Sequence, residues 1–383
     1  MRQLPSNENL FLHQKGLQHH LTPAYQQAVV IVISCMFLGL GYALLWDSHE
    51  TIVPLINGIV IGLSCGVSIA WSELFLFKSI GRKWSFIALV STKVIAYVLI
   101  LSLSIFTVIL ISRSIEYGQD PITTFYGQRF QHLLFHEDFH IMVLYAVVMA
   151  SVIIFTKEMS RKMGQGVLFN FITGKYQKPF REERIFMFLD LDASSSLAEK
   201  LGDLQYHQLL NEFYFDITED IIEARGEIYQ YVGDEVVVTW KMKRGLPAGN
   251  CLRAYFNILH KIESVKDKYT NRFGTLPRFK AAFHCGEVIT AQVGDVKTEI
   301  VFHGDVVNTT SRIEHLCSEL GERLLISKDL LDKLPLSFVD FFKPVGKVRP
   351  RGKERHVELF GLKESEKPSN ELSELKLQNP LTS

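Results

Sequence analysis

The first 156 residues of the chain consist mainly of long apolar runs, whereas most charged residues lie in positions 157–383. Four of these runs are long enough, or nearly so, to cross a bilayer as a helix, which takes roughly 17–25 residues. The pattern predicts a transmembrane domain over 25–156 with spans at Tyr25–Trp46, Ile52–Phe77, Trp84–Ser112 and Phe139–Phe155, the last being the shortest.

Charges at the ends of these runs indicate an orientation. Basic residues occupy the connection Lys78–Lys83 and the exit from the fourth run at Lys157, Arg161 and Lys162, whereas the other two connections are mostly acidic. Because basic loops stay on the cytoplasmic side, we expect a multi-pass protein of the inner (plasma) membrane with both chain ends in the cytoplasm. The polar segment 1–24 shows no signal-peptide pattern and is predicted to be a cytoplasmic N-terminal segment.

Ionisable residues in the membrane half are candidates for function, since charge is costly at bilayer depth. Lys93, inside the third run, either serves the function of this domain or extends to the interface, whereas Glu73 is expected to reach the cytoplasmic interface. His132, His136 and His140 would share one face of a helix. That spacing suits a metal or pH sensor, but it also suits an interfacial turn in which the histidines are incidental.

The periodicity changes after a linker at 157–183, in which Gly164, Gly166 and Gly174 argue against one continuous helix. Alternation and helical spacing then predict strands at Arg184–Leu189, Glu227–Val232, Glu235–Trp240, Phe279–His284, Glu287–Val293 and Thr298–Phe302, and helices at Leu204–Ala224, Pro247–Phe273 and Asp305–Leu320. The order βαββαβ, with further C-terminal strands, indicates an α+β ferredoxin-like domain over 184–362. The polar segment 363–383 is predicted to be a disordered tail.

Two aspartates lie at the predicted strand ends. Asp190 ends the first strand, and Asp234 lies in the turn of the hairpin that should pair beside it. Two carboxylates and a main-chain carbonyl, that of Leu191, would suit a pair of Mg²⁺ or Mn²⁺ ions, which activate a hydroxyl and neutralise a leaving polyphosphate. Each aspartate alone could simply cap backbone amides in a turn, but together at adjacent strand ends they favour a metal site.

A helix after Gly304 carries Asn308 and Arg312 four residues apart, hence on one face. In a domain with paired carboxylates, this pair suits ribose positioning and stabilisation of charge on a phosphoryl group. Near the C-terminus, Arg351 and Lys353 are candidates to bind a triphosphate.

Residues 184–362 resemble the catalytic domain of class III nucleotidyl cyclases. The resemblance rests on F-M-F-L-D-L at 186–191, Y-V-G-D-E at 231–235 and G-D-V-V-N-T-T-S-R at 304–312, in that order. It implies that Asp190 and Asp234 bind two metal ions and that Asn308 and Arg312 act on the ribose and the α-phosphate. It further implies a head-to-tail homodimer with two shared sites, in which the ribose 3′-hydroxyl attacks the α-phosphate to give a 3′,5′-cyclic nucleotide and pyrophosphate.

Two positions depart from the family pattern and leave the base open. Gln230 and Val301 stand where adenine-selective members usually carry Lys and Asp or Thr, and guanine-selective members Glu and Cys. The Gln230 amide can donate and accept, so it could pair with either purine. The prediction is a membrane-anchored adenylate cyclase acting on ATP, with a guanylate cyclase acting on GTP as the alternative.

Other classes of protein fit the sequence less well. A catalytically silent nucleotide sensor would be expected to lose one of the aspartates or Arg312. A diguanylate cyclase would carry G-G-D-E-F, but Val232 precedes G-D-E here, and four spans without repeats do not favour a transporter. The 41 basic and 41 acidic residues give no reason to expect a nucleic-acid partner, and five cysteines without a C-x-x-C pair indicate neither a disulfide framework nor a zinc site. The input ligand or membrane partner is not indicated.

Overall fold

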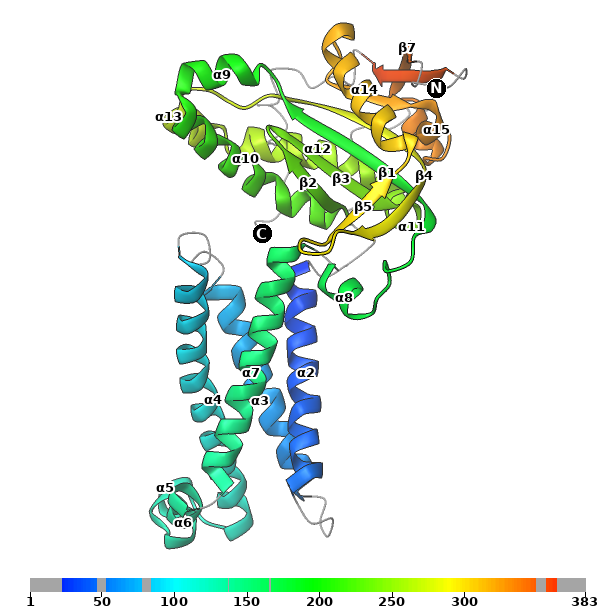
Figure 1. Ribbon diagram of the computed structural model, residues 1–383. Coiled ribbons are helices and arrows are strands. Elements are labelled where there is room, and N and C mark those ends of the chain that lie inside the picture. The colour runs from blue at the N-terminus through cyan, green and yellow to red at the C-terminus, as the bar shows by residue number, and fades with distance from the viewer. Residues whose placement is uncertain are drawn as a thin grey trace, which may run out of the picture. The chain divides into compact units, whose positions relative to one another are not determined.

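The computed structural model describes residues 23–46, 53–77, 84–136, 138–164, 167–348 and 356–363 (Figure 1). The chain divides into two compact units, Met1–Arg161 and Lys162–Ser383, which we call the helical unit and the sheet unit. Much of the predicted tail at 363–383 lies outside the described residues.

In the described part of the helical unit, long helices form at all four predicted apolar runs, with two short helices between the last two. Their bounds are α2 (Pro23–Trp46), α3 (Val53–Phe75), α4 (Phe86–Tyr117), α5 (Pro121–Tyr126), α6 (Gln128–His136) and α7 (Asp138–Met163). Ser85 caps the start of α4, and Gly118, in the left-handed region at φ 64°, ends it.

Glycines allow α2 and α3 to pack closely. Gly58, Gly62 and Gly66 recur every fourth residue and therefore lie along one side of α3. A Cβ added at Gly62 would stand 2.8 Å from the Cα of Met36 on α2, and one added at Gly66 would stand 2.8 Å from the Cα of Val32. Small residues spaced in this way are typical of helix pairs in membranes, where close backbone approach replaces hydrophobic burial as the source of stability.

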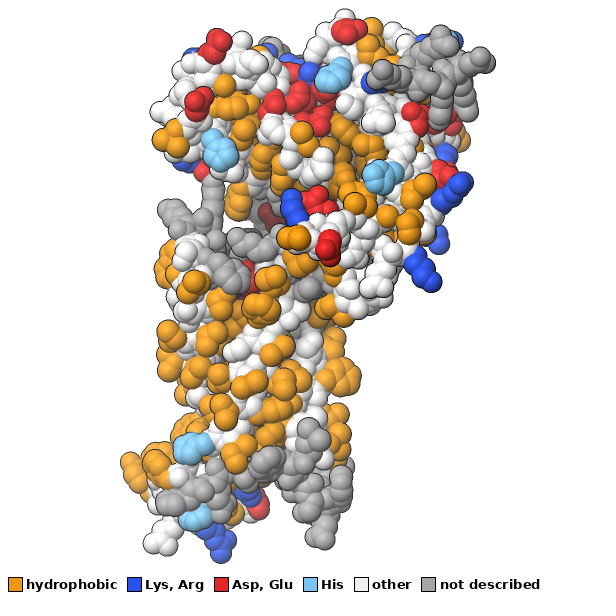
Figure 2. Space-filling model, viewed as in Figure 1, with side chains coloured by type: hydrophobic (Ala, Val, Ile, Leu, Met, Phe, Trp, Pro, Cys, Tyr) orange, Lys and Arg blue, Asp and Glu red, His pale blue; other side chains and the backbone are white. Residues whose placement is uncertain are grey.

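Three helices of the helical unit are long and apolar enough to cross a membrane, over Leu55–Phe75, Ile87–Tyr117 and Phe139–Ser160, and α2 has a shorter apolar stretch at Ala28–Leu44. Large apolar side chains cover much of the outside of this unit (Figure 2). The last helix, α7, extends beyond the predicted end of the fourth span at Phe155, so that Lys157 belongs to this helix and not to the predicted linker at 157–183.

His132 lies on α6, which is described as far as His136, and His140 lies on α7, which is described from Asp138. Residue 137 lies outside the described residues, so the shared helical face of the three histidines stays a prediction.

The sheet unit is built on one mixed sheet with the strand order β2-β3-β1-β4-β6-β8-β7, and β5 pairs with β4 off this path. The first four strands in that order match the predicted βαββαβ arrangement, with β1 between β3 and β4. The strands are β1 (Phe180–Leu191), β2 (Glu227–Val232), β3 (Glu235–Lys241), β4 (Phe279–Val293), β5 (Glu299–His303), β6 (Leu324–Ser327), β7 (Phe342–Val348) and β8 (Val357–Leu362).

Helices cover both faces of this sheet (Figure 1). The helices are α8 (Val167–Ile172), α9 (Ser194–Leu201), α10 (Asp203–Glu223), α11 (Met242–Gly245), α12 (Asn250–Ser264), α13 (Lys266–Phe273), α14 (Asp305–Leu320), α15 (Lys328–Leu331) and α16 (Leu336–Val339), with a 3₁₀ turn at Pro247–Gly249. Alternate residues of β1 face opposite sides: Met187 and Leu189 join the main core with α10 and α12, whereas Phe186 and Phe188 pack with Val306 of α14.

The sequence predicted two separate strands at Phe279–His284 and Glu287–Val293, but β4 is one strand of 15 residues. Gly286, which lies in the gap between the two predicted strands, is inside β4. A Cβ there would stand 2.7 Å from Cγ2 of Val306, so this glycine makes room for α14 and does not end a strand.

Candidate active site

Four carboxylates and one lysine meet near the end of β1. Asp190 is aligned with Glu235 on β3 and with Lys280 on β4, and Asp234 precedes Glu235 in the β2–β3 turn. Glu314 reaches the same place from α14, where its Oε1 lies 3.1 Å from Nζ of Lys280. Acidic side chains are seen gathered on this face of the sheet unit in Figure 2. The structure thus brings both predicted aspartates into one acidic cluster, which we define as these four carboxylates.

The acidic cluster carries more negative charge than its one lysine offsets. Burial, the charge of Asp234 and that of Glu314 raise the pKa of Asp190 to about 6, against the attraction of Lys280. Burial and the charges of Glu314, Asp190 and Asp234 raise the pKa of Glu235 to about 8. Accumulated carboxylates that disfavour one another's ionised forms are the electrostatic setting that a divalent cation relieves.

The turn that carries Asp234 is fixed by its own geometry and by α10. Gly233 adopts a φ of 63°, in the left-handed region that glycine adopts without strain. The Tyr214 hydroxyl on α10 donates a hydrogen bond of 2.9 Å to the carbonyl oxygen of Gly233. The position of Asp234 beside Asp190 is therefore set by contacts outside the two aspartates themselves.

The oxygen ligands at the end of β1 fit a magnesium or manganese ion whose remaining ligands come from a substrate. Among the side chains that the structure describes, no three His, Cys, Asp or Glu residues converge in a ready-made metal site. However, Mg²⁺ in nucleotide enzymes is usually held by one or two carboxylates together with phosphate oxygens of the substrate. Asp190, Asp234 and the carbonyl of Leu191, the last residue of β1, could supply such a partial set.

The helix that carries Asn308 and Arg312 has the predicted bounds, Asp305–Leu320. Its inner face includes Ile313 and Cys317, which pack against the sheet. Asn308 is exposed and Arg312 is half-buried. At the entry, a Cβ on Gly304 would stand 3.0 Å from the carbonyl oxygen of Glu287, so a residue without a side chain lets α14 start close to β4.

The two predicted base-contacting residues lie on strands that are held side by side. Gln230, on β2, is exposed, and Val301, on β5, is half-buried. Their chain neighbours Tyr229 and Phe302 are in ring contact, with centroids 4.9 Å apart. This contact joins β2 to β5, although β5 pairs only with β4 in the described sheet.

A buried arginine supports the same contact. The Arg184 side chain is 1% exposed, and its guanidinium lies 4.5 Å from the centre of the Phe302 ring. It donates hydrogen bonds of 2.8 Å to Glu182 and to Glu227, which is the first residue of β2. Cation–π contact and paired charges together satisfy the buried guanidinium and tie β1, β2 and β5 together.

The two predicted triphosphate-binding residues, Arg351 and Lys353, lie in segment 349–355, outside the residues that the structure describes. Sequence reasoning did not identify Glu235, Lys280, Glu314 or Arg184. Glu235 follows Asp234 directly in Y-V-G-D-E, so it could have been found from the motif. Lys280 and Glu314 meet only through strand register and helix packing, and the partners of Arg184 likewise come from other strands.

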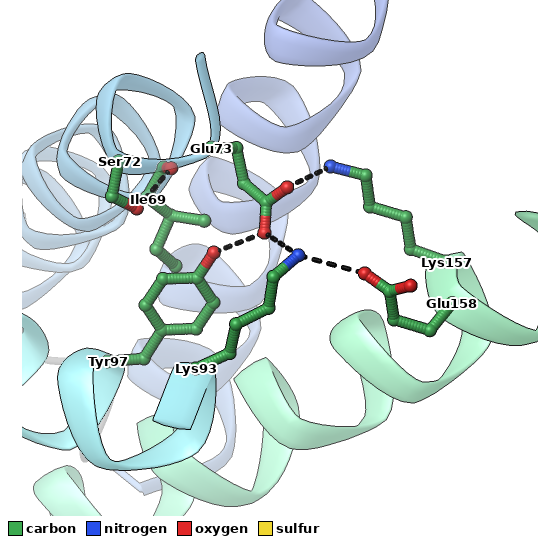
Figure 3. A network of polar contacts seen from close by, with 7 residues as sticks. All are labelled: Ile69, Ser72, Glu73, Lys93, Tyr97, Lys157 and Glu158. Carbon is green, nitrogen blue, oxygen red and sulfur yellow. Dashed lines mark hydrogen bonds and ion pairs between the residues drawn. The ribbon is translucent and has the colours of Figure 1, made fainter. Parts of the chain in front are cut away.

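The helical unit contains a buried polar cluster (Figure 3). The Lys93 ammonium on α4 donates hydrogen bonds of 2.8 Å to Glu73 on α3 and to Glu158 on α7. Lys157 and the Tyr97 hydroxyl also donate to Glu73, at 2.6 and 2.5 Å. The side chains of Lys93 and Glu73 are 4% and 13% exposed, so both are largely enclosed by the bundle and bound to each other there.

Comparison with known proteins places the sheet unit in a family. Residues 177–363 match the family model described as the adenylate and guanylate cyclase catalytic domain. The chain is 38% identical over 193 residues to adenylate cyclase 2 of Rhizobium meliloti (strain 1021), covering 50% of this chain and 53% of that protein. It is 31% identical over 153 residues to a receptor-type guanylate cyclase of Caenorhabditis elegans, covering 36% of this chain and 14% of that protein.

Among solved structures, a bacterial light-regulated adenylyl cyclase is similar, with a TM-score of 0.49 and 21% identity over 60% of this chain and 67% of that chain. The chain spans about half the length of the adenylate cyclase of Rhizobium meliloti and a smaller part of the guanylate cyclase of Caenorhabditis elegans.

Proposed function

Since residues 177–363 belong to the family of adenylate and guanylate cyclase catalytic domains, we propose that this protein is a membrane-anchored adenylate cyclase. It converts ATP to 3′,5′-cyclic AMP and pyrophosphate in a homodimer with shared sites. The observation that carries the proposal is the acidic cluster at the end of β1, where Asp190 and Asp234 lie together in a unit that also carries Asn308 and Arg312 on α14.

The reaction is one in-line displacement at the α-phosphorus. The oxygen of the ribose 3′-hydroxyl bonds to this phosphorus and the hydroxyl loses its proton. The bond from the α-phosphorus to the oxygen that bridges to the β-phosphate breaks, which releases pyrophosphate. Most of the catalytic task is therefore positioning and charge stabilisation.

Named groups of the protein would divide this task. Asp190, Asp234 and the Leu191 carbonyl would hold Mg²⁺ or Mn²⁺, which would favour the ionised 3′-oxygen and neutralise charge on the leaving polyphosphate. Asn308 orients the ribose, and the planar guanidinium of Arg312 stabilises charge on the α-phosphate. Asn308 is exposed, which suits a residue that completes the site of a second subunit.

Adenine is the base that we assign to the site. Of the two relatives named above, the one that matches over more residues and at higher identity is an adenylate cyclase. The base would lie near Gln230 and Val301, which the Tyr229–Phe302 contact holds on neighbouring strands. The Gln230 amide can both donate to and accept from the adenine edge. Cyclic GMP formed from GTP is the outcome that would instead make the protein a guanylate cyclase.

Membrane anchoring is assigned to α2, α3, α4 and α7, with both chain ends in the cytoplasm. Three of these helices are long and apolar enough to span a bilayer. Lys157 and the basic residues that follow it lie at the end of α7 that leads to the sheet unit, as expected for a cytoplasmic exit.

The proposal is tested by turnover of the full-length protein with ATP or GTP, in Mn²⁺ and then Mg²⁺, with both products identified by mass. We expect cyclic AMP and pyrophosphate from ATP. A folded protein that makes neither cyclic nucleotide would refute the enzymatic assignment and favour a nucleotide sensor.

Shared sites are tested by co-expressing two differently tagged inactive variants and purifying the mixed dimer. Asp190→Ala paired with Arg312→Ala should regain one active site per dimer, because each subunit supplies what the other lacks. Asp190→Ala paired with Asp234→Ala is the matched control and should stay inactive, since both lesions affect the metal-holding half. Equal activity in the two mixed dimers would contradict the shared-site arrangement.

A further inference from the structure

Lys280 is the cation that the structure places within the acidic cluster. Strand register aligns it with Asp190 across the β1–β4 pair. Its Nζ lies 3.4 Å from Oδ2 of Asp190 and 3.1 Å from Oε1 of Glu314, and it donates a hydrogen bond of 2.9 Å to the Ser318 hydroxyl. The side chain is 14% exposed, so water screens these charges only partly.

Neutralising the buried Glu314 carboxylate explains only one of the two carboxylate contacts that Lys280 makes. Glu314 is 1% exposed and needs a cation, and Lys280 meets that need through the 3.1 Å contact. The same ammonium also faces Asp190, whose side chain is 20% exposed and borders the position assigned to the metal. The contact between Lys280 and Asp190 is therefore not explained by the need to neutralise Glu314.

We propose that Lys280 is a positioning residue that orients the Asp190 carboxylate in the metal-free site and keeps the affinity for free divalent cations low. A metal ion bound by Asp190 must lie close to the ammonium, and two cations at short distance repel each other. A metal ion that arrives with the nucleotide brings triphosphate charge that offsets this repulsion. The site thus favours the metal–nucleotide complex over the bare ion.

This inference rests on the proposed function, because it takes Asp190 as a metal ligand. It concerns a contact between β1, β4 and α14 within one subunit, so it does not depend on the identity of the base or on the shared-site arrangement.

The test measures binding of Mn²⁺ alone, without nucleotide, to the purified full-length protein, by the electron paramagnetic resonance signal of the free ion. Lys280→Met keeps the length of the side chain and removes its charge, and Lys280→Arg keeps the charge. Lys266→Met removes a lysine paired with Glu263 on the surface and controls for the change in net charge. Unfolding curves confirm that each variant is folded.

We expect Lys280→Met to bind Mn²⁺ roughly tenfold more tightly than the wild type, because the neighbouring positive charge is gone. Lys280→Arg and Lys266→Met should stay within about twofold of the wild type, since each leaves a cation beside Asp190. Unchanged or weaker binding by Lys280→Met would overturn the role of Lys280 while leaving the metal site intact. If Asp190→Ala binds Mn²⁺ as tightly as the wild type, the metal site itself is wrong, and this inference fails with it.

Discussion

Replacing Asp190 with asparagine should stabilise the metal-free sheet unit at neutral pH while it abolishes activity. Asparagine has nearly the size of aspartate but no charge, so the repulsion from Asp234 and Glu314 disappears. Residues arranged for catalysis often lower the stability of the fold in this way, because the arrangement that suits the substrate is strained without it.

The size of the effect follows from the pKa of Asp190, which is about 6 in the folded unit and 3.8 for an unperturbed aspartate. At about 1.4 kcal/mol for each pKa unit, this difference corresponds to an upper value of about 3 kcal/mol. The variant also loses the attraction between Asp190 and Lys280, so we expect a net gain of about 1–2 kcal/mol in the free energy of unfolding.

Folding raises the pKa of Asp190, and this fixes the direction in which the free energy of unfolding changes with pH. Below about pH 4, Asp190 is protonated in both the folded and the unfolded states, and the aspartate costs no stability. Between about pH 4 and pH 6, Asp190 ionises in the unfolded chain but stays largely protonated in the folded unit, so the wild type progressively loses stability relative to the variant. The advantage of Asp190→Asn should therefore be small at pH 4 and complete above pH 7.

Urea unfolding of the fragment 162–383 in EDTA provides the assay. Trp240 is the one tryptophan in this part of the sequence; it is buried and donates a hydrogen bond of 3.0 Å to the carbonyl of Ala224, so its fluorescence reports unfolding. Asp295→Asn, at an exposed position, is the control and should change nothing. The reasoning is refuted if Asp190→Asn is no more stable than wild type at pH 7.5, or if its advantage is equal at pH 4.

Two further predictions concern the helical unit, and both are measured by thermal unfolding of the purified protein in detergent. Gly62→Leu should destabilise the α2–α3 pair by about 3 kcal/mol or more, because a side chain there meets the backbone at Met36. Gly41→Leu is the control and should be tolerated, because nothing lies within 4 Å of a Cβ added at Gly41. Equal unfolding temperatures of the two variants would contradict the packing argument. Lys93→Met should cost about 3–5 kcal/mol, because it removes the cation that contacts buried Glu158 and leaves Glu73 with Lys157 alone. Adding Glu158→Gln should recover part of this loss. A double variant less stable than Lys93→Met would show that Glu158 is not the partner that matters.

Local signals accounted for much of the sheet unit. The helix Asp305–Leu320 and the strand Glu227–Val232 have the predicted bounds, because a glycine turn, helical spacing or alternation marks each of them in the sequence itself. The strand β4 was divided wrongly at Gly286, since a glycine that makes room for a neighbouring helix has the same appearance as one that ends a strand.

Contacts between residues far apart in the sequence could not be predicted from the sequence alone. Lys93 is 65 residues from Glu158, and nothing local pairs them. Lys280 joins Asp190 only through the register of β1 and β4. Asp190 and Asp234 could be placed together because the βαββαβ order puts their strands next to each other, whereas Arg184 under Phe302 requires β5 to fold back on β4.

The Tyr229–Phe302 contact, supported by buried Arg184, separates the residues that hold two strands together from the residues proposed to contact the base. Tyr229 and Phe302 join β2 to β5, whereas the adjacent residues Gln230 and Val301 take no part in this ring contact. If these two residues contact the base, as proposed above, substitutions at 230 and 301 change the base preference while the Tyr229–Phe302 contact stays intact. Under the proposed function, substrate choice in this domain is therefore open to evolutionary change at low cost to the fold.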